Sequence, residues 1–198
     1  MTEVIASLRV DREFLNNSKN IGHEIHMGVI ALVIPAIVFI AALIIPGVLI
    51  LDYVHVLFGA LWTGIDVFLG LIFFIVLSGI GDRIRSDISF RLIPMLLYFI
   101  PAMSIFTPLL GLALAIRENM FRLDYLFIAV ITISIALAVV SFAVIVPAIY
   151  SIYKGFKSNN IDESRNGKLL MRIAKAASLQ MVLQIIIISL MAYIVVYI

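Results

Sequence analysis

Apolar runs long enough to cross a membrane alternate with short polar stretches along most of this chain. A bilayer core needs about 20 apolar residues per helix, and five runs reach that length. The pattern therefore predicts five membrane-spanning helices, at residues 27–50, 54–79, 91–116, 125–150 and 176–198.

The first 22 residues follow a different pattern. Val4 and Leu8 are interspersed with charged residues such as Arg12, a weakly amphipathic arrangement that is typical of a short helix lying on a membrane surface. We therefore expect two parts, an N-terminal amphipathic surface segment over residues 1–22 and a transmembrane domain over residues 23–198.

The composition agrees with this pattern. Of the 198 residues, 64% are hydrophobic and 13% are charged, whereas soluble domains carry about 25% charged residues. We expect an all-α integral membrane protein, a bundle of five transmembrane helices in a cell membrane, with the lipid bilayer as its partner. The sequence contains no cysteine, which excludes disulfide bonds and thiolate metal ligands.

The basic residues predict the orientation of the bundle. Of the 14 Lys and Arg residues, Arg117 and Arg122 fall on one side of the predicted topology and the other twelve fall on the opposite side. The positive-inside rule then places the N-terminus inside and the C-terminus outside. The net charge of +2 thus reflects topology, and we expect no nucleic-acid partner.

The second apolar run contains the stretch HVLFGALWTGID, residues 55–66, in which polar side chains interrupt apolar ones. At about 100° per residue, one narrow helical stripe carries His55, Gly59, Trp62 and Asp66. The stripe descends from the outer interface, and Asp66 lies about 16 Å below His55, close to the bilayer midplane.

An ionised aspartate at that depth costs about 2.5–3.5 kcal/mol on insertion scales. We therefore expect Asp66 to face the interior of the bundle. In one interpretation it is protonated and bonded to Ser104 or Thr107, which lie at similar depth on the third helix. In the other it belongs to a ligand, proton or ion path.

His55 also has two interpretations. It either caps the outer end of its helix beside Asp52, or its imidazole binds a haem iron or a copper ion. In the second case Trp62 would form a pocket wall, and the bare backbone of Gly59 would let a flat ligand approach.

The arrangement of His55, six residues, Trp62, one residue and Gly64 resembles the H-x6-W-x-G signature of the copper-resistance D family of small polytopic membrane proteins. The region is also similar to the HemJ-type protoporphyrinogen oxidases. The resemblance implies that His55 binds haem b or copper, with Trp62 and Gly64 as framing residues. The chain departs from the family at Ile65, where a second glycine is common.

A second ligand for such a cofactor is not obvious. His23 and His26 precede the first predicted helix and lie about 30 Å from His55, across the membrane. Methionine could serve instead, either Met103 near mid-depth or Met120 at the outer end of the third helix, and its thioether suits copper(I). A second copy of His55 in a homodimer is another source.

Three smaller features have alternative interpretations. His23 and His26 share a helical face, which fits either a metal chelate or an interfacial cap. The third helix carries a proline every seven residues, which fits either a cavity wall or kinked packing. Gln180 and Gln184, one turn apart on the fifth helix, are expected to form interhelical hydrogen bonds.

The leading hypothesis is a small membrane protein that binds haem b or copper in the outer half of its bundle, for electron transfer, cofactor-dependent oxidation or copper passage. A second hypothesis is a cofactor-free proton- or ion-coupled transporter or channel that uses Asp66. A third is an accessory subunit of a larger, respiratory-type membrane complex.

Overall fold

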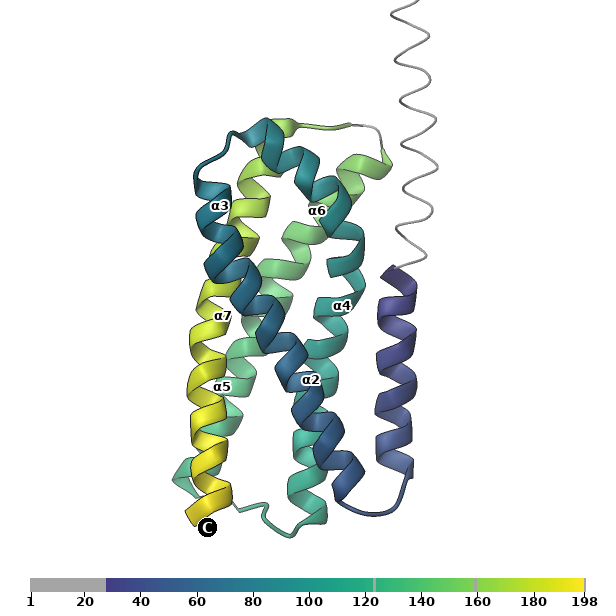
Figure 1. Ribbon diagram of the computed structural model, residues 1–198, viewed down its shortest axis with the longest axis vertical. Coiled ribbons are helices and arrows are strands. Elements are labelled where there is room, and N and C mark those ends of the chain that lie inside the picture. The colour runs from purple at the N-terminus through teal and green to yellow at the C-terminus, as the bar shows by residue number, and fades with distance from the viewer. Residues whose placement is uncertain (1–27, 123, 159, 198) are drawn as a thin grey trace, which may run out of the picture.

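The computed structural model describes residues 28–122, 124–158 and 160–197 of the chain, and all of its regular elements there are helices. They run antiparallel in one elongated bundle (Figure 1). In chain order they are a first helix Gly28–Ile44, α2 Leu49–Val67, η1 Phe68–Phe73, α3 Phe74–Ser78, α4 Asp82–Arg117, α5 Tyr125–Val140, η2 Ser141–Ile145, α6 Val146–Lys157 and α7 Glu163–Tyr197. The predicted surface segment, residues 1–22, lies outside the described residues, as do His23 and His26.

The prediction of an all-α membrane bundle is confirmed. The first predicted run covers the first helix, the turn after it and the start of α2. Within the described residues each of the other four runs falls on a helix or on a continuous series of helices, because η1 and η2 are π-helical segments that join their neighbours without a break. Four of these helices or helix series, called rods below, are long and apolar enough to span a membrane: Leu49–Ser78, Asp82–Arg117, Tyr125–Lys157 and Glu163–Tyr197. The first helix is a shorter apolar one. The protein is therefore a small integral membrane protein.

The helix boundaries differ from the predicted ones in two places. Residues 51–53, which separate the first two predicted spans, belong to α2, because the chain turns earlier, at Pro46 and Gly47. Gly47 has φ 110°, a left-handed conformation that favours glycine. The guanidinium of Arg117 donates hydrogen bonds to the carbonyl oxygens of Ile45 and Gly47, at 3.2 and 3.3 Å, and ties this turn to the end of α4.

The second difference is that α4 and α7 begin well before their apolar runs, at Asp82 and Glu163. At 1.5 Å per residue, the 36 residues of α4 span about 54 Å, whereas the hydrocarbon core is about 30 Å thick. The extra turns are charged, and hydropathy reports only the part of a helix that suits lipid. Both helices therefore extend past the hydrocarbon at the same end of the bundle.

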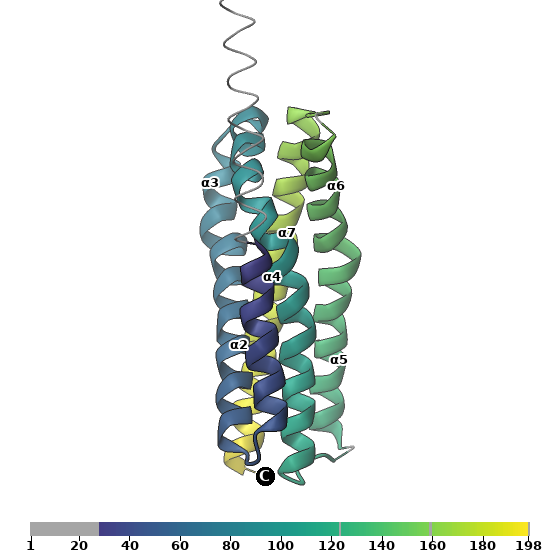
Figure 2. The same ribbon diagram turned by 90° about the vertical axis from the view of Figure 1, so that its right-hand side faces the viewer.

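The charges are unequal at the two ends. The α3–α4 and α6–α7 connections lie at one end, and the α4–α5 connection and the end of α7 lie at the other (Figures 1 and 2). The end near the α3–α4 and α6–α7 connections, called the basic end below, carries Arg83, Arg85, Arg91, Lys154, Lys157, Arg165, Lys168, Arg172 and Lys175. Among the described residues the opposite end carries Arg117 and Arg122, so the predicted charge asymmetry follows the helix connections.

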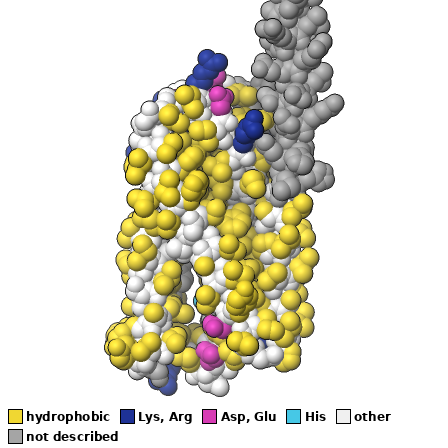
Figure 3. All heavy atoms as spheres, in the orientation of Figure 1, with side chains coloured by type: hydrophobic (Ala, Val, Ile, Leu, Met, Phe, Trp, Pro, Cys, Tyr) yellow, Lys and Arg dark blue, Asp and Glu magenta, His cyan; other side chains and the backbone are white. Residues whose placement is uncertain are grey.

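Helix α7 packs against every other rod from α2 to α6, and helix α4 contacts α2, α6 and α7. The first helix packs beside α4, where Phe39 stacks on Phe106 with ring centroids 4.6 Å apart. Hydrophobic side chains cover the middle of the face shown in Figure 3, and charged groups gather toward its two ends. This distribution is what a lipid-facing surface requires.

Candidate functional site

The predicted stripe on α2 faces the interior of the bundle at its two deepest side chains. Trp62 is 3% exposed and Asp66 is fully buried. His55 and Gly59 are half-buried, whereas Gly64 is exposed on the outer surface of the helix. The four stripe residues therefore lie on one side of α2, whereas Gly64, the framing residue that the family resemblance implied, lies on a different side.

His55 is held against α4 by a hydrogen bond and by a close fit. Its Nδ1 lies 3.0 Å from the backbone carbonyl oxygen of Thr107. A carbonyl can only accept, so Nδ1 carries the proton, and in the neutral imidazole Nε2 then keeps its lone pair. The ring rests on Gly111, where a Cβ would approach the His55 Cε1 atom to 2.7 Å. No local pattern in the sequence marks either α4 residue as a neighbour of His55.

Asp66 lies near the middle of α2–α3 with both carboxyl oxygens buried and without a hydrogen-bond partner among the described residues. The side chain of Gln184 on α7 is its polar neighbour. No hydrogen bond of ordinary length and geometry joins them, and both amide atoms of Gln184 are also unpaired within the described part of the chain. A buried polar group without a partner costs about 1–3 kcal/mol in proteins, so this pair is destabilising as it stands.

A second group of polar side chains lies one helical turn from Gln184. The Gln180 Nε2 atom donates to the Ser141 hydroxyl at 2.6 Å and to the Leu137 carbonyl at 3.0 Å. The Ser104 hydroxyl also donates to Ser141, at 2.8 Å. All three polar side chains are buried, and they join α4, η2 and α7.

These groups form one set, called the polar chain below, which consists of Asp66, Gln184, Gln180, Ser141 and Ser104. Its Asp66–Gln184 end is unpaired, and its Gln180–Ser141–Ser104 end is hydrogen-bonded. The predicted interhelical bonding of Gln180 is confirmed, whereas that of Gln184 is wrong, because neither of its amide atoms has a hydrogen-bond partner in the described part of the chain. The predicted bond from Asp66 to Ser104 or Thr107 is absent, because Ser104 bonds to Ser141 and the Thr107 hydroxyl has no partner among the described residues.

Both π-helical segments lie next to the polar chain. Ser141 is the first residue of η2, and Pro147, shortly after that segment, removes one backbone donor. Gly70 of η1 lies one turn beyond Asp66, where the Ser178 hydroxyl donates to its carbonyl oxygen. Short π segments inside α-helices occur frequently at functional sites.

The metal ligands predicted from the sequence are spread along the bundle. Met103 is fully buried, one turn deeper along α4 than Thr107. Met120 follows the end of α4, and the ten residue steps from Thr107 to Arg117 alone span about 15 Å. Within the described ranges, no three His, Asp or Glu side chains come close enough to hold a metal ion together.

Sequence reasoning missed Ser141, the residue that connects α4 and α7 through η2. A signal was present, because a lone hydroxyl in the apolar run AVVSFAV is unusual in lipid-facing sequence. Its partners on two other helices cannot be read from a local pattern.

Comparison of the chain with protein-family models, curated proteins and solved structures finds no match.

Proposed function

We propose that this membrane protein conducts protons and that Asp66 is the group that takes up and releases them at the middle of the bilayer. One observation carries the proposal: the Asp66 carboxyl is fully buried, yet neither oxygen has a hydrogen-bond partner in the described part of the chain. Ionisable residues at this depth are expensive to keep and mark ion or proton pathways. An acid kept for structure alone would be expected to bond its neighbours.

The surroundings of Asp66 suit a carboxyl group that changes protonation state. A carboxylate only accepts hydrogen bonds, whereas a carboxylic acid also donates one. The Gln184 amide beside it can donate or accept, and it is unpaired. The same neighbour could therefore serve both forms after a small side-chain rotation.

The test is proton flux in vesicles that contain the purified protein and an internal pH-sensitive dye. A potassium diffusion potential set by valinomycin supplies the driving force. We expect vesicles with the protein to change internal pH at least several-fold faster than protein-free vesicles of the same lipid. Equal initial rates in the two preparations would overturn the proposal.

A second candidate function, haem or copper binding at His55, is supported by a separate observation. Metal-binding histidines almost always donate their other ring N–H to a carboxylate, carbonyl or water, which fixes the ring. The Nδ1 contact with the Thr107 carbonyl is such an arrangement, and it leaves Nε2 as the ligating atom. Met103 is the buried thioether on the facing helix. A bound haem or copper would supply one-electron redox chemistry.

The cofactor proposal predicts an optical signature. Protein purified in mild detergent should show a Soret band and a reduced α band, or should contain copper at a stoichiometric level. His55→Ala should remove at least nine-tenths of the bound cofactor, whereas His23→Ala should retain it. Equal cofactor content in the two variants would exclude His55 as the ligand.

A further inference from the structure

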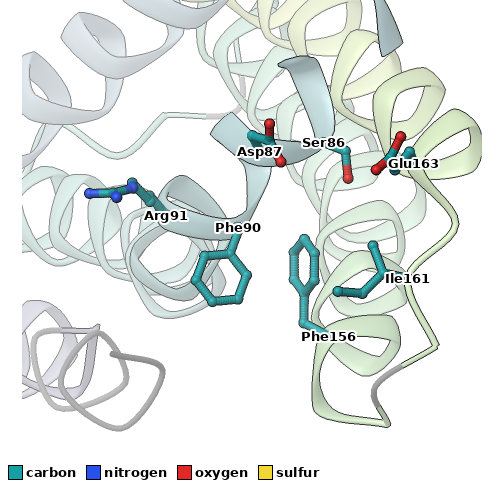
Figure 4. A pocket seen from close by; sticks show the side chains of 7 residues that line it. All are labelled: Ser86, Asp87, Phe90, Arg91, Phe156, Ile161 and Glu163. Atoms are coloured by element: carbon teal, nitrogen blue, oxygen red, sulfur yellow. The ribbon is translucent and has the colours of Figure 1, made fainter. Parts of the chain in front are cut away.

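A hollow of about 290 Å³ opens at the basic end of the bundle, between the start of α4, the end of α6 and the start of α7. Figure 4 shows the side chains around it. It is lined by Ser86, Asp87, Phe90, Arg91, Phe156, Ile161 and Glu163. It does not include any member of the polar chain.

The lining combines an apolar wall with charges of both signs. The rings of Phe90 and Phe156 meet edge to face, with centroids 5.1 Å apart. Asp87 and Glu163 lie on one side of these rings, and the Arg91 side chain extends away from the rings on the side opposite Glu163 (Figure 4).

These charged side chains are available to a ligand. All three are exposed, and the contact of Glu163 with Arg83 is a long, exposed one of 4.0 Å. Ion pairs of that kind contribute at most about 1 kcal/mol. A ligand that carries both a cation and an anion could therefore pair with carboxylates and guanidinium together.

The depth of the hollow indicates what kind of molecule reaches it. Arg91 is the residue at which the apolar run of α4 begins, so the phenylalanine rings lie at the edge of the hydrocarbon. Asp87 lies one turn farther out, at the level of lipid headgroups. The occupant with access to both levels is an amphiphile of the membrane itself.

We propose that this hollow binds the headgroup of phosphatidylethanolamine. The phosphate pairs with the Arg91 guanidinium, which suits it by charge and shape. The primary ammonium donates hydrogen bonds to Asp87 and Glu163, and an acyl chain continues along Phe90 and Phe156. Phosphatidylglycerol has no ammonium, and the quaternary ammonium of phosphatidylcholine has no N–H to donate, so both fit less well.

The experiment is a titration of delipidated protein in detergent with the three lipids, all with identical acyl chains, followed by native mass spectrometry. We expect phosphatidylethanolamine to bind at least fivefold more tightly than either of the other two. Arg91→Gln should weaken its binding about tenfold, and Arg91→Lys should weaken it less. The double variant Asp87→Asn with Glu163→Gln should abolish the preference over phosphatidylcholine.

Arg172→Gln is the matched control. Arg172 lies nine residues into α7, as Arg91 lies nine residues into α4, and it is exposed but does not line the hollow. An equal loss of binding in Arg172→Gln and Arg91→Gln would overturn the proposal, because it would show a nonspecific attraction of lipid to the many basic residues at the basic end. Tighter binding of phosphatidylglycerol would overturn it too, as would equal binding of glycerophosphoethanolamine, which carries the headgroup without acyl chains.

Discussion

Replacing Gly70 by alanine is expected to lower the stability of the bundle sharply. A Cβ at this position would lie 2.6 Å from the Ala177 carbonyl carbon and 2.6 Å from the Ser178 Cα. These are backbone atoms, so no side-chain rotation relieves the clash and α7 must move away from η1. Overpacking of this kind typically costs about 1–3 kcal/mol, and occasionally more. Thermal unfolding in detergent should show the loss.

Gly64→Ala is the matched control for Gly70→Ala. Gly64 lies six residues earlier in the same rod, and a Cβ there would meet nothing within 4 Å. Removing a glycine from a helix interior should leave stability unchanged or raise it by up to about 1 kcal/mol. Similar unfolding temperatures for the two variants would show that α7 does not approach Gly70 closely.

Asp66→Leu is expected to raise the stability of the protein. The carboxyl is buried and unpaired among the described residues, so the fold bears its desolvation cost without a compensating bond. An apolar side chain of larger but comparable size removes that cost, which is about 1–3 kcal/mol. The measurement is the unfolding temperature of the variant and of the parent protein in the same detergent.

Gln180→Leu should have the opposite effect and is the comparison for Asp66→Leu. Gln180 donates to both Ser141 and the Leu137 carbonyl, so its replacement removes two buried hydrogen bonds between helices. If Asp66→Leu also lowered stability, Asp66 would be a structural residue with bonding partners, and its assignment to a proton path would lose its main support.

Much of the fold can be predicted from the sequence, because membrane helices are determined by local properties. An apolar run of the right length identifies a span wherever it occurs, and the 100° helical repeat places Trp62 and Asp66 on one inward face. The charged turns that extend α4 and α7 were not predicted, because hydropathy does not report helix outside lipid. Gly47 sets the first turn by its backbone conformation, which an apolar pattern does not encode.

The candidate site is less predictable because its contacts are made between helices. The sequence indicated that Asp66 needs a polar neighbour and favoured Ser104 or Thr107. In the structure Ser104 donates to Ser141, and Gln184 is the polar neighbour of Asp66. Similarly, His55 lies against a backbone carbonyl and a glycine, neither of which has a side-chain signal. Helix rotation and relative depth decide these pairings, and one chain read in isolation does not fix them.

The proton flux of Asp66→Asn relative to the parent protein tests the central claim most directly. Asparagine keeps the size of the side chain and cannot take up or release a proton at this position. Asp52→Asn is the control, because Asp52 is an exposed acid near the start of the same helix. At matched protein density, we expect Asp66→Asn to reduce flux to the rate of protein-free vesicles and Asp52→Asn to leave it unchanged. Parental flux in Asp66→Asn would contradict the account.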